Sequence, residues 1–376
     1  MKELDKHFNN GVYRDGHDGR DRLFSDYLKI YERAFGSKPF DWENGYDVEK
    51  YLGFKLPIKN QQNSLSCVGQ GSSYYKQLYE YYLKRVSKEK SAKSVYSQIF
   101  LPQGGAWLRD AMRLICNYGI NLEEEVPSYQ YGEDVPEEFI RDKSWMNYSM
   151  TKKAKYYANS SYYRIDGFSI DDFAKAIEIG KGALIAVTGN NNGTWYSKFP
   201  KPPTDDIPQS ELWGHAVVAV GALMIDNKKY IKIKNSWGNI GENGYQYLGE
   251  EWFTSDGKWI FNPWVFCPKI MFKQDDLKNA TAYTIFIKKI TEDGSEIRKQ
   301  RQGFCIERNG EKKLIIASES IITKLREDIA QKEYKDVSGN SFWAFSTPKI
   351  TIEISDSDYN NLKKYDQSWN TLEDNI

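Results

Sequence analysis

The sequence predicts an α+β protein in which a helix-rich half precedes a strand-rich half. In residues 72–86 the apolar side chains Tyr75, Leu78 and Tyr82 recur at the spacing of one helix face. After residue 182 the apolar runs become short and β-branched, and Gly or Asn-Lys turns bound them. This change of period separates a helical part of the chain from a part built of strands.

Two more helices are expected before the strands begin. Residues 106–120 place Met112 and Ile115 on an apolar face and end at an Asn-Tyr-Gly sequence. Residues 169–182 carry Ser169 at the N-cap position, with Gly180 at the end. Strands are predicted over residues 183–189, 215–223, 228–237 and 244–249.

A small, separate α+β domain is expected beyond residue 272, where a polar stretch interrupts the pattern. Its strands are predicted over residues 282–290, 312–318, 341–346 and 349–354, with a helix over residues 320–332. We therefore divide the chain into an N-terminal extension (1–36), a main domain (37–272) and an accessory domain (273–376). The accessory domain shows no catalytic motif, so docking to an assembly partner is inferred from its position alone.

Composition indicates an ordinary globular chain and no charged macromolecular partner. The 376 residues include 52 basic and 52 acidic side chains, so the formal net charge is +0. This balance favours neither nucleic acid nor a membrane surface as partner. No apolar run approaches the ~18 residues needed to span a bilayer, and the first residues lack the apolar core of a classical secretion signal. A cytoplasmic or virion-associated location is expected.

The four cysteines are predicted to be free thiols. Cys67, Cys116, Cys267 and Cys305 lie far apart, without a CxxC pair, so no zinc site is expected, and the sequence predicts no cofactor. A chain of this size without an export signal is expected to keep its thiols reduced. Cys116, Cys267 and Cys305 lie among apolar or aromatic residues and are interpreted as structural.

Cys67 is the cysteine whose surroundings suggest chemistry. Of the three histidines, His215 begins an apolar strand, and twenty residues later Asn235 ends another strand. A thiol peptidase needs a cysteine at a helix N-terminus, an imidazole to pair with it and a group that orients the imidazole. Cys67, His215 and Asn235 can supply these parts in that order.

The chain resembles the papain-like cysteine peptidases over roughly residues 37–270. Five blocks carry the resemblance: the Asp41-Trp42 pair, "QQNSLSC" with Gln61 six residues before Cys67, the Gly104-Gly105 pair, "GHAVVAVGA" around His215, and "KNSWGNIGENGY" with Asn235 and Trp237. The resemblance implies a two-lobed fold, with a helical N-terminal lobe and an antiparallel β-barrel-like C-terminal lobe. It also implies a cysteine endopeptidase that acts on proteins or peptides.

The resemblance implies a role for each matched residue. Cys67 is the expected nucleophile, His215 its base and Asn235 the group that orients the imidazole. Gln61 is expected to donate to the oxyanion, where the loss of one donor typically costs ~10²–10³ in rate. Trp237 would shield the His–Asn bond, while Gly104 and Gly105 would bind the substrate backbone. We expect the thiol pKa to fall from ~8.5 into the range ~3.5–7.5.

The chain departs from the common pattern around the nucleophile. Ser64 replaces the usual disulfide cysteine, and Leu65 and Val68 flank the Ser66-Cys67 pair, which resembles disulfide-free prokaryotic and phage-type members. Gly69 and Gly71 in the first helical turns suggest close packing of a neighbouring strand. The 36 residues before the match are shorter than the inhibitory propeptides of secreted members.

Two other functions use the same residues. The fold can serve as a structural or binding component of a larger assembly, such as a virion. Alternatively, the thiol can carry amidase or transpeptidase chemistry on cell-wall peptides. The Pro-rich loop over residues 196–213 leads directly to His215 and is expected to run beside the cleft.

Overall fold

The computed structural model describes residues 11–85, 88–129, 136–158, 161–191, 193–268, 281–290, 296–308, 311–316, 321–324 and 349–353. The chain divides into two compact units, one of Met1–Tyr27 with Lys38–Pro268, the other of Leu28–Ser37 with Lys269–Ile376. All the residues predicted to act chemically belong to the first unit.

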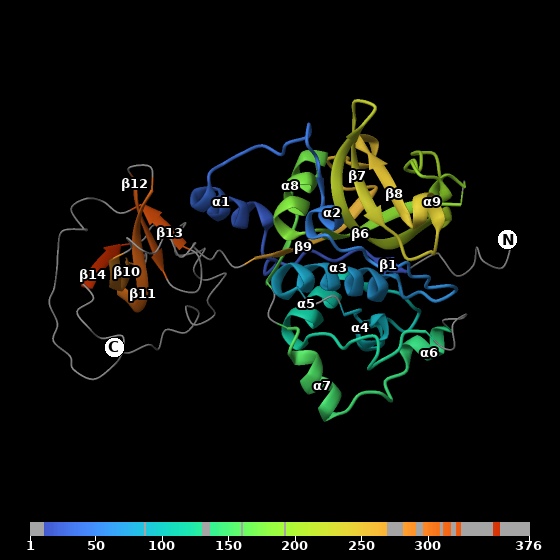
Figure 1. Cartoon of the computed structure of the whole chain (residues 1–376), viewed down its shortest axis with the longest axis horizontal. Coiled ribbons are helices and arrows are strands. Elements are labelled where there is room, and N and C mark those ends of the chain that lie inside the picture. The colour runs from blue at the N-terminus through green and yellow to red at the C-terminus, as the bar shows by residue number, and fades with distance from the viewer. Residues whose placement is uncertain are drawn as a thin grey trace. The chain divides into compact units, whose positions relative to one another are not determined.

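The first unit has a helical lobe built around one buried helix. Its helices are α3 (Cys67–Lys84), α4 (Ala92–Ile99), α5 (Leu108–Tyr118), α6 (Glu137–Arg141) and α7 (Tyr148–Lys155). In Figure 1 α3 lies between the other four and the sheet of the second lobe. Tyr74, Tyr75 and Leu78 of α3 are fully buried. The predicted helix at 72–86 is therefore confirmed, with its start at Cys67.

The second lobe is an antiparallel sheet. Its strands are β2 (Tyr46–Asp47), β4 (Ser161–Arg164), β5 (Ala183–Asn190), β6 (Leu212–Ile225), β7 (Lys228–Lys234), β8 (Tyr245–Gly249) and β9 (Ile260–Cys267). The order is β4-β9-β5-β6-β7-β8, with β2 also paired to β6. Among the described residues β4 and β8 do not pair, so the sheet is barrel-like without closing. Together with the helical lobe it confirms the α+β, two-lobed fold.

Helix α8 (Ile170–Gly180) covers the sheet and begins as the sequence predicts. The Ser169 hydroxyl accepts from the backbone N–H of Asp172 at 3.1 Å, and the Asp172 carboxylate accepts from the N–H of Ser169 at 3.1 Å. This reciprocal capping box satisfies two backbone donors that the first helical turn leaves unpaired. The remaining elements of this unit include β1 (Val12–Tyr13), α2 (Val48–Leu52), β3 (Ala106–Trp107) and α9 (Ile240–Asn243), and α1 (Phe24–Phe35) belongs to both units.

Gly69 and Gly71 allow α3 to lie unusually close to its neighbours. A Cβ on Gly69 would lie 2.8 Å from the carbonyl oxygen of Ala92 in α4, and one on Gly71 would lie 2.9 Å from Leu184 Cδ1 of β5. The expected close packing is confirmed, with a strand at Gly71 and with a helix at Gly69.

The described part of the second unit is a five-stranded sheet. Its strands are β10 (Thr281–Ile290), β11 (Glu296–Arg308), β12 (Glu311–Ile316), β13 (Ile321–Lys324) and β14 (Lys349–Glu353), in the order β13-β12-β11-β10-β14. The helix predicted over 320–332 is wrong at its start, because Ile321 and Ile322 pair with β12 as β-branched strand residues. The rest of that helix and the strand predicted over 341–346 lie outside the described residues.

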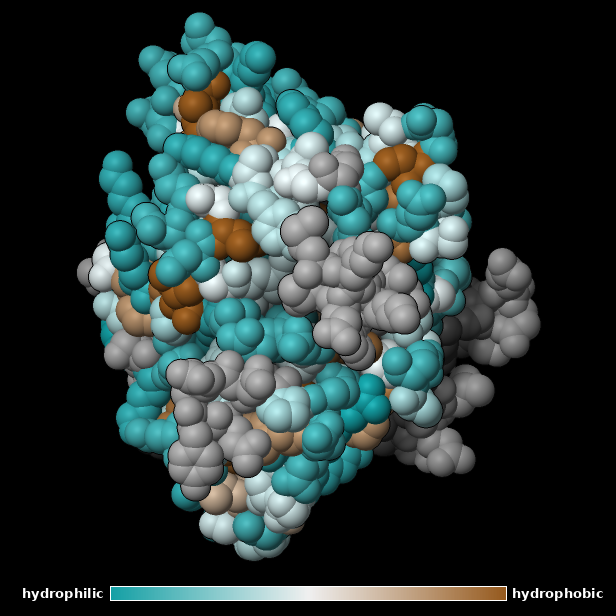
Figure 2. Space-filling model, turned by 90° about the vertical axis from the view of Figure 1, so that its right-hand side faces the viewer, coloured by the Kyte–Doolittle hydropathy of each residue, from teal (hydrophilic) through white to brown (hydrophobic). Residues whose placement is uncertain are grey.

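The surface of the described residues shows no gathered apolar patch on the face in Figure 2, where hydrophobic residues are scattered among hydrophilic ones. No helix in the described part of the chain is both long and apolar enough to cross a bilayer.

The close contact at Gly69 predicts a stability cost for any added side chain. Gly69→Ala is expected to lower the free energy of unfolding by about 1–3 kcal/mol through overpacking against a backbone oxygen that cannot move away. Urea unfolding measures the change. The matched control is Gly19→Ala, since a Cβ there meets nothing within 4 Å. Equal stability of Gly69→Ala and wild type would contradict the predicted overpacking.

Candidate active site

Cys67 is the first residue of α3, with Ser66 at the N-cap. Because the first turn of a helix has unpaired backbone N–H groups, the sulfur lies at the positive end of the helix dipole. The backbone N–H groups of Ala216 and Val68 hydrogen bond to the thiol. Ala216 follows His215 in β6, so the structure brings the predicted nucleophile against the strand that carries the predicted base.

His215 and Asn235 come together through the β6–β7 pairing. Val218 lies opposite Lys234, so the start of β6 faces the residues that follow the end of β7. The distance between His215 Nε2 and Asn235 Oδ1 is 2.9 Å, and both side chains are buried. Asn235 Oδ1 also accepts from the backbone N–H of Ser236 at 2.7 Å. With Nε2 donating to Asn235, the ring nitrogen Nδ1 remains the one able to accept a proton.

Tryptophan rings enclose the imidazole. The Trp237 ring centroid lies 4.5 Å from that of His215, as the shielding role predicts. Trp195 and Trp213 approach His215 edge-on at 6.0 and 6.4 Å. These two belong to the segment around the Pro-rich loop of residues 196–213, which therefore lines the site as expected. The aromatic cover excludes water from the His–Asn hydrogen bond.

Gln61 is held next to the Asn235 loop. Its backbone N–H donates to Ser236 O at 2.8 Å, and its Oε1 accepts from the Ser236 hydroxyl at 2.7 Å. Nε2 donates to Ser64 O at 2.9 Å, which uses one of its two hydrogens. Ser64, which stands where a disulfide cysteine was expected by resemblance, donates to Gln61 O at 2.7 Å. Hydrogen bonds thus hold this loop without a disulfide.

Gly104 and Gly105 form a turn that leads into β3, and both have φ in the left-handed region, at +95° and +69°. Their backbone N–H groups already have partners, since Gly104 donates to Leu101 O and Gly105 to the Tyr96 hydroxyl. A Cβ on Gly104 would also collide with the Leu65 side chain. The strand edge beside Cys67 is therefore Ala106–Trp107, immediately after the glycine pair.

An N-terminal segment occupies this edge. Val12 and Tyr13 of β1 pair in parallel with Ala106 and Trp107, and Ala106 N–H donates to Gly11 O at 3.3 Å. A Cβ on Gly11 would lie 2.7 Å from Cys67 Sγ, so only a glycine passes the sulfur this closely. We call residues 11–21 the covering segment. This part of the predicted N-terminal extension therefore reaches the thiol.

Hydrogen bonds and an ion pair, most of them part-buried, anchor the covering segment. Asp15 accepts from Trp264 Nε1 at 2.9 Å, and its backbone N–H donates to Asn262 Oδ1 at 2.9 Å. Arg109 of α5 makes a two-point ion pair with Asp21 at 2.9 and 2.7 Å and also donates to Gly16 O. Burial raises the pKa of Asp15 to about 6. The segment is therefore held more firmly at low pH, and part of this hold is lost as the pH rises through 6.

The covered site favours a neutral thiol and a neutral imidazole. Burial raises the pKa of Cys67 to about 12 and lowers that of His215 to about 4. The expected fall of the thiol pKa is thus wrong for this state, because with the covering segment in place Cys67 is fully buried and His215 is 2% exposed. Ionisation of the pair needs the water or the substrate dipoles that the segment excludes.

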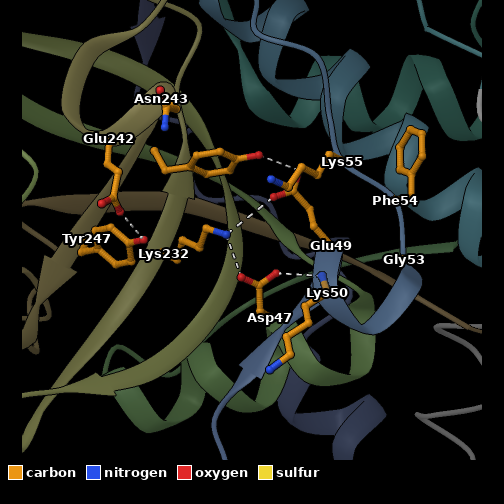
Figure 3. Close-up of a pocket in the computed structure, with 11 residues that line it drawn as sticks. Asp47, Glu49, Lys50, Gly53, Phe54, Lys55, Lys232, Glu242, Asn243 and Tyr247 are labelled. Carbon is orange, nitrogen blue, oxygen red and sulfur yellow. Dashed lines mark hydrogen bonds and ion pairs between the residues drawn. The ribbon is translucent and has the colours of Figure 1, made fainter.

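A second pocket, of about 530 Å³, lies apart from Cys67 between α2 and the β7–β8 hairpin. Figure 3 shows Lys232 pointing toward Asp47 and Glu49. Its Nζ lies 2.7 Å from Asp47 Oδ2 and 3.6 Å from Glu49 Oε2. Tyr245 and Tyr247 of β8 also line it. Its charges neutralise one another, and it contains neither thiol nor imidazole. In the described part of the chain no cluster of three His, Cys, Asp or Glu side chains fits a metal ion.

The other cysteines are reduced where they are described. Cys116 and Cys267 are free thiols in α5 and β9, as predicted. Cys305 lies in β11, for which only the backbone is described. Burial raises the pKa of both Cys116 and Cys267, which fits a structural role for these thiols.

Comparisons with known proteins point to one family. The sequence model of the papain family cysteine proteases matches residues 57–254, just over half the chain. Xylellain, a cysteine protease from Xylella fastidiosa, superimposes with a TM-score of 0.54 at 21% identity, covering 69% of this chain and 96% of that one. ProCathepsin B S9 from Trypanosoma congolense gives 0.53 at 13% identity, covering 70% and 88%. No curated protein sequence matches the chain.

The anchors of the covering segment predict a change in thiol access. The double variant Asp15→Ala/Arg109→Ala is expected to alkylate at Cys67 at least about tenfold faster than wild type, since a tenfold change needs only about 1.4 kcal/mol. Mass spectrometry of the Cys67 peptide after iodoacetamide treatment gives the rate. Arg113→Ala, an exposed arginine on the same helix, is the control. An unchanged rate in a folded double variant would show that these anchors do not govern access.

The buried imidazole predicts a loss of stability in acid. The pKa of His215 is about 4 in the fold and 6.5 when unfolded. The unfolded chain therefore binds the proton first as the pH falls through 6.5. When the pH falls from 7 to 4, His215 should therefore lower the free energy of unfolding of the wild type by about 3 kcal/mol. The His215→Gln variant should not show this loss. Urea unfolding at both values measures the difference, with exposed His17→Gln as control. A parallel loss in His215→Gln would refute the assignment.

Proposed function

The chain belongs to the papain family of cysteine proteases, and on that premise we propose that it is an active cysteine endopeptidase with Cys67 as its nucleophile. The observation that carries the proposal is the junction of α3 with β6. There the thiol at the helix start touches the backbone beside His215, whose Nε2 is tied to Asn235.

The proposed reaction begins when substrate replaces the covering segment. His215 Nδ1 takes the thiol proton, and the thiolate attacks the scissile carbonyl carbon. The resulting imidazolium, which Asn235 orients through Nε2–H, gives its proton to the leaving amine as the C–N bond breaks. Water, deprotonated by the same imidazole, then hydrolyses the thioester and regenerates the thiol. Each proton taken by His215 is returned within one turnover.

Two donors are proposed to stabilise the tetrahedral oxyanion. The backbone N–H of Cys67 has no intrahelical acceptor, because it belongs to the first turn of α3. The second hydrogen of Gln61 Nε2 completes the pair, while Ser236 and Ser64 hold the amide in one orientation. Since these donors are fixed before the charge develops, they need no reorganisation during the reaction.

The covering segment also supports an endopeptidase. Gly11 passes Cys67 as an internal residue, with chain on both sides of it, so the site accommodates a peptide that does not end there. The edge of β3 at Ala106–Trp107 is proposed to bind the substrate backbone by strand addition. Gly104 and Gly105 are proposed to shape the turn that presents this edge.

The nucleophile is tested with a fluorogenic peptide blocked at both ends, which only an internal cleavage can release. Cys67→Ala is expected to lower kcat/KM by at least ~10⁴-fold, and Gln61→Ala by ~10²–10³-fold. Cys116→Ala is the control and should keep full activity.

The same assay is run in the Asp15→Ala/Arg109→Ala background, so that a covered thiol is not mistaken for an inert one. If neither background cleaves the peptide or binds the epoxide inhibitor E-64 at Cys67, the enzyme proposal fails and a structural role is supported. Transfer of the acyl group to added glycinamide in place of water would instead identify a transpeptidase.

A further inference from the structure

Gln246 lies one residue beyond the sequence block that carries Asn235, on strand β8, and the roles assigned above do not use it. It is fully buried. Its neighbours Tyr245 and Tyr247 line the polar pocket of Figure 3. Since side chains alternate along a strand, Gln246 points to the opposite face, toward the catalytic residues. A buried amide needs partners for all its polar atoms, so its contacts define its role.

The amide orientation of Gln246 is determined by two backbone carbonyls. Nε2 donates to Trp195 O and, at 3.2 Å, to Ser197 O. Both hydrogens of the Gln246 amide are therefore donated to backbone carbonyl oxygens, which can only accept hydrogen bonds. The remaining atom, Oε1, must face the other way, and it accepts from Asn235 Nδ2 at 2.7 Å.

This contact selects one of the two orientations of Asn235. A flipped Asn235 amide would place Oδ1 against Gln246 Oε1, two acceptors without a proton between them. The observed orientation directs Oδ1 to His215 Nε2 and to the N–H of Ser236. Asn235 can accept from the imidazole only in this orientation, so Nε2 keeps its proton and Nδ1 stays unprotonated on the side of the thiol.

We propose that Gln246 is a positioning residue that sets the amide orientation of Asn235 and, through it, the tautomer of His215. The backbone carbonyls of residues 195 and 197 fix the orientation of the Gln246 amide, and Gln246 in turn fixes that of Asn235. The same loop carries Trp195, which packs against the imidazole. One short segment thus both encloses His215 and orients it. The inference rests on the proposed function only for its catalytic consequence, since the tautomer is a property of the resting protein.

The test compares Gln246→Leu with Gln70→Leu. Gln70 is an equally buried glutamine whose amide also bonds at both ends, to Ser66 and Tyr129, so its described hydrogen bonds do not involve Asn235. In ¹⁵N spectra of the histidine rings, wild type and Gln70→Leu should show His215 protonated at Nε2. Gln246→Leu should show a mixture of tautomers. The His215→Gln spectrum assigns the signals.

The kinetic expectation is a fall in kcat of about tenfold to a hundredfold with little change in KM. It is smaller than the cost of losing the base, because the N–H of Ser236 still favours the correct orientation. An unchanged tautomer together with an unchanged kcat in folded Gln246→Leu overturns the proposal. A shifted tautomer in a chain that cleaves no peptide supports this role of Gln246 and rejects the endopeptidase.

Gln246→Glu provides a variant of nearly the same shape. An ionised carboxylate would face the two carbonyl oxygens without a hydrogen to donate. A protonated one donates its single hydrogen to one of them, and its other oxygen still accepts from Asn235. The variant should therefore regain activity relative to wild type as the pH falls toward 5. The elements packed against β8 are β7, α9 and the short helix Glu250–Trp252, and they carry the charged side chains Lys228, Lys229, Lys232, Lys234, Glu242, Glu250 and Glu251. Glu49 and Lys198 also contact residues of β8. These groups are present in both wild type and Gln246→Glu, so their titration cancels in the ratio of the two activities at each pH. The remaining pH dependence of that ratio reports the carboxyl introduced at position 246. A constant ratio overturns the proposal.

Discussion

The contact of the α3 N-terminus with strand β6 is the interaction on which the rest of the site depends. Gly71 allows the helix to lie against Leu184 and the backbone at Ala216. The thiol at the helix start then reaches the N–H of Ala216, beside His215. Without this close approach, the thiol of Cys67 and the imidazole of His215, which come from different lobes, would not share one dry space. The close packing at Gly71, about one helical turn beyond Cys67, thus determines where the proposed chemistry can occur.

The polar groups of the site form one buried network that joins three loops. Gln61, Ser236 and Asn235 connect the loop before α3 with the end of β7, and Gln246 adds the loop at residues 195–197. Such networks stabilise only when every member is satisfied, and an incomplete one costs more than an apolar replacement. The geometry of His215 is therefore a property of the whole network. The tryptophans around it keep water from competing for these bonds.

Much of this arrangement could be predicted from the sequence, and the exceptions have physical reasons. Gln61, Cys67, His215 and Asn235 stand out because their spacing places them at element ends, which motif patterns record well. The covering segment carries no such signal, since Gly11-Val12-Tyr13 is too short to show a period. Gln246 lies in an alternating strand, and alternation indicates two faces without indicating which one is buried. The thiol pKa depends on solvent exclusion by a distant segment, which no local pattern contains.

The covering segment belongs to the same chain as the site that it occupies, and this has a consequence for how the site competes. A tethered occupant is present at an effective concentration on the order of mM, whatever the concentration of the protein. Dilution therefore leaves the covered fraction unchanged. A peptide that enters must outbind the parallel pairing of Val12 and Tyr13 with β3 against this constant local excess. The site thus selects among peptides by their binding affinity before any bond is broken. A peptide that binds weakly does not displace the covering segment and does not reach the Cys67 sulfur.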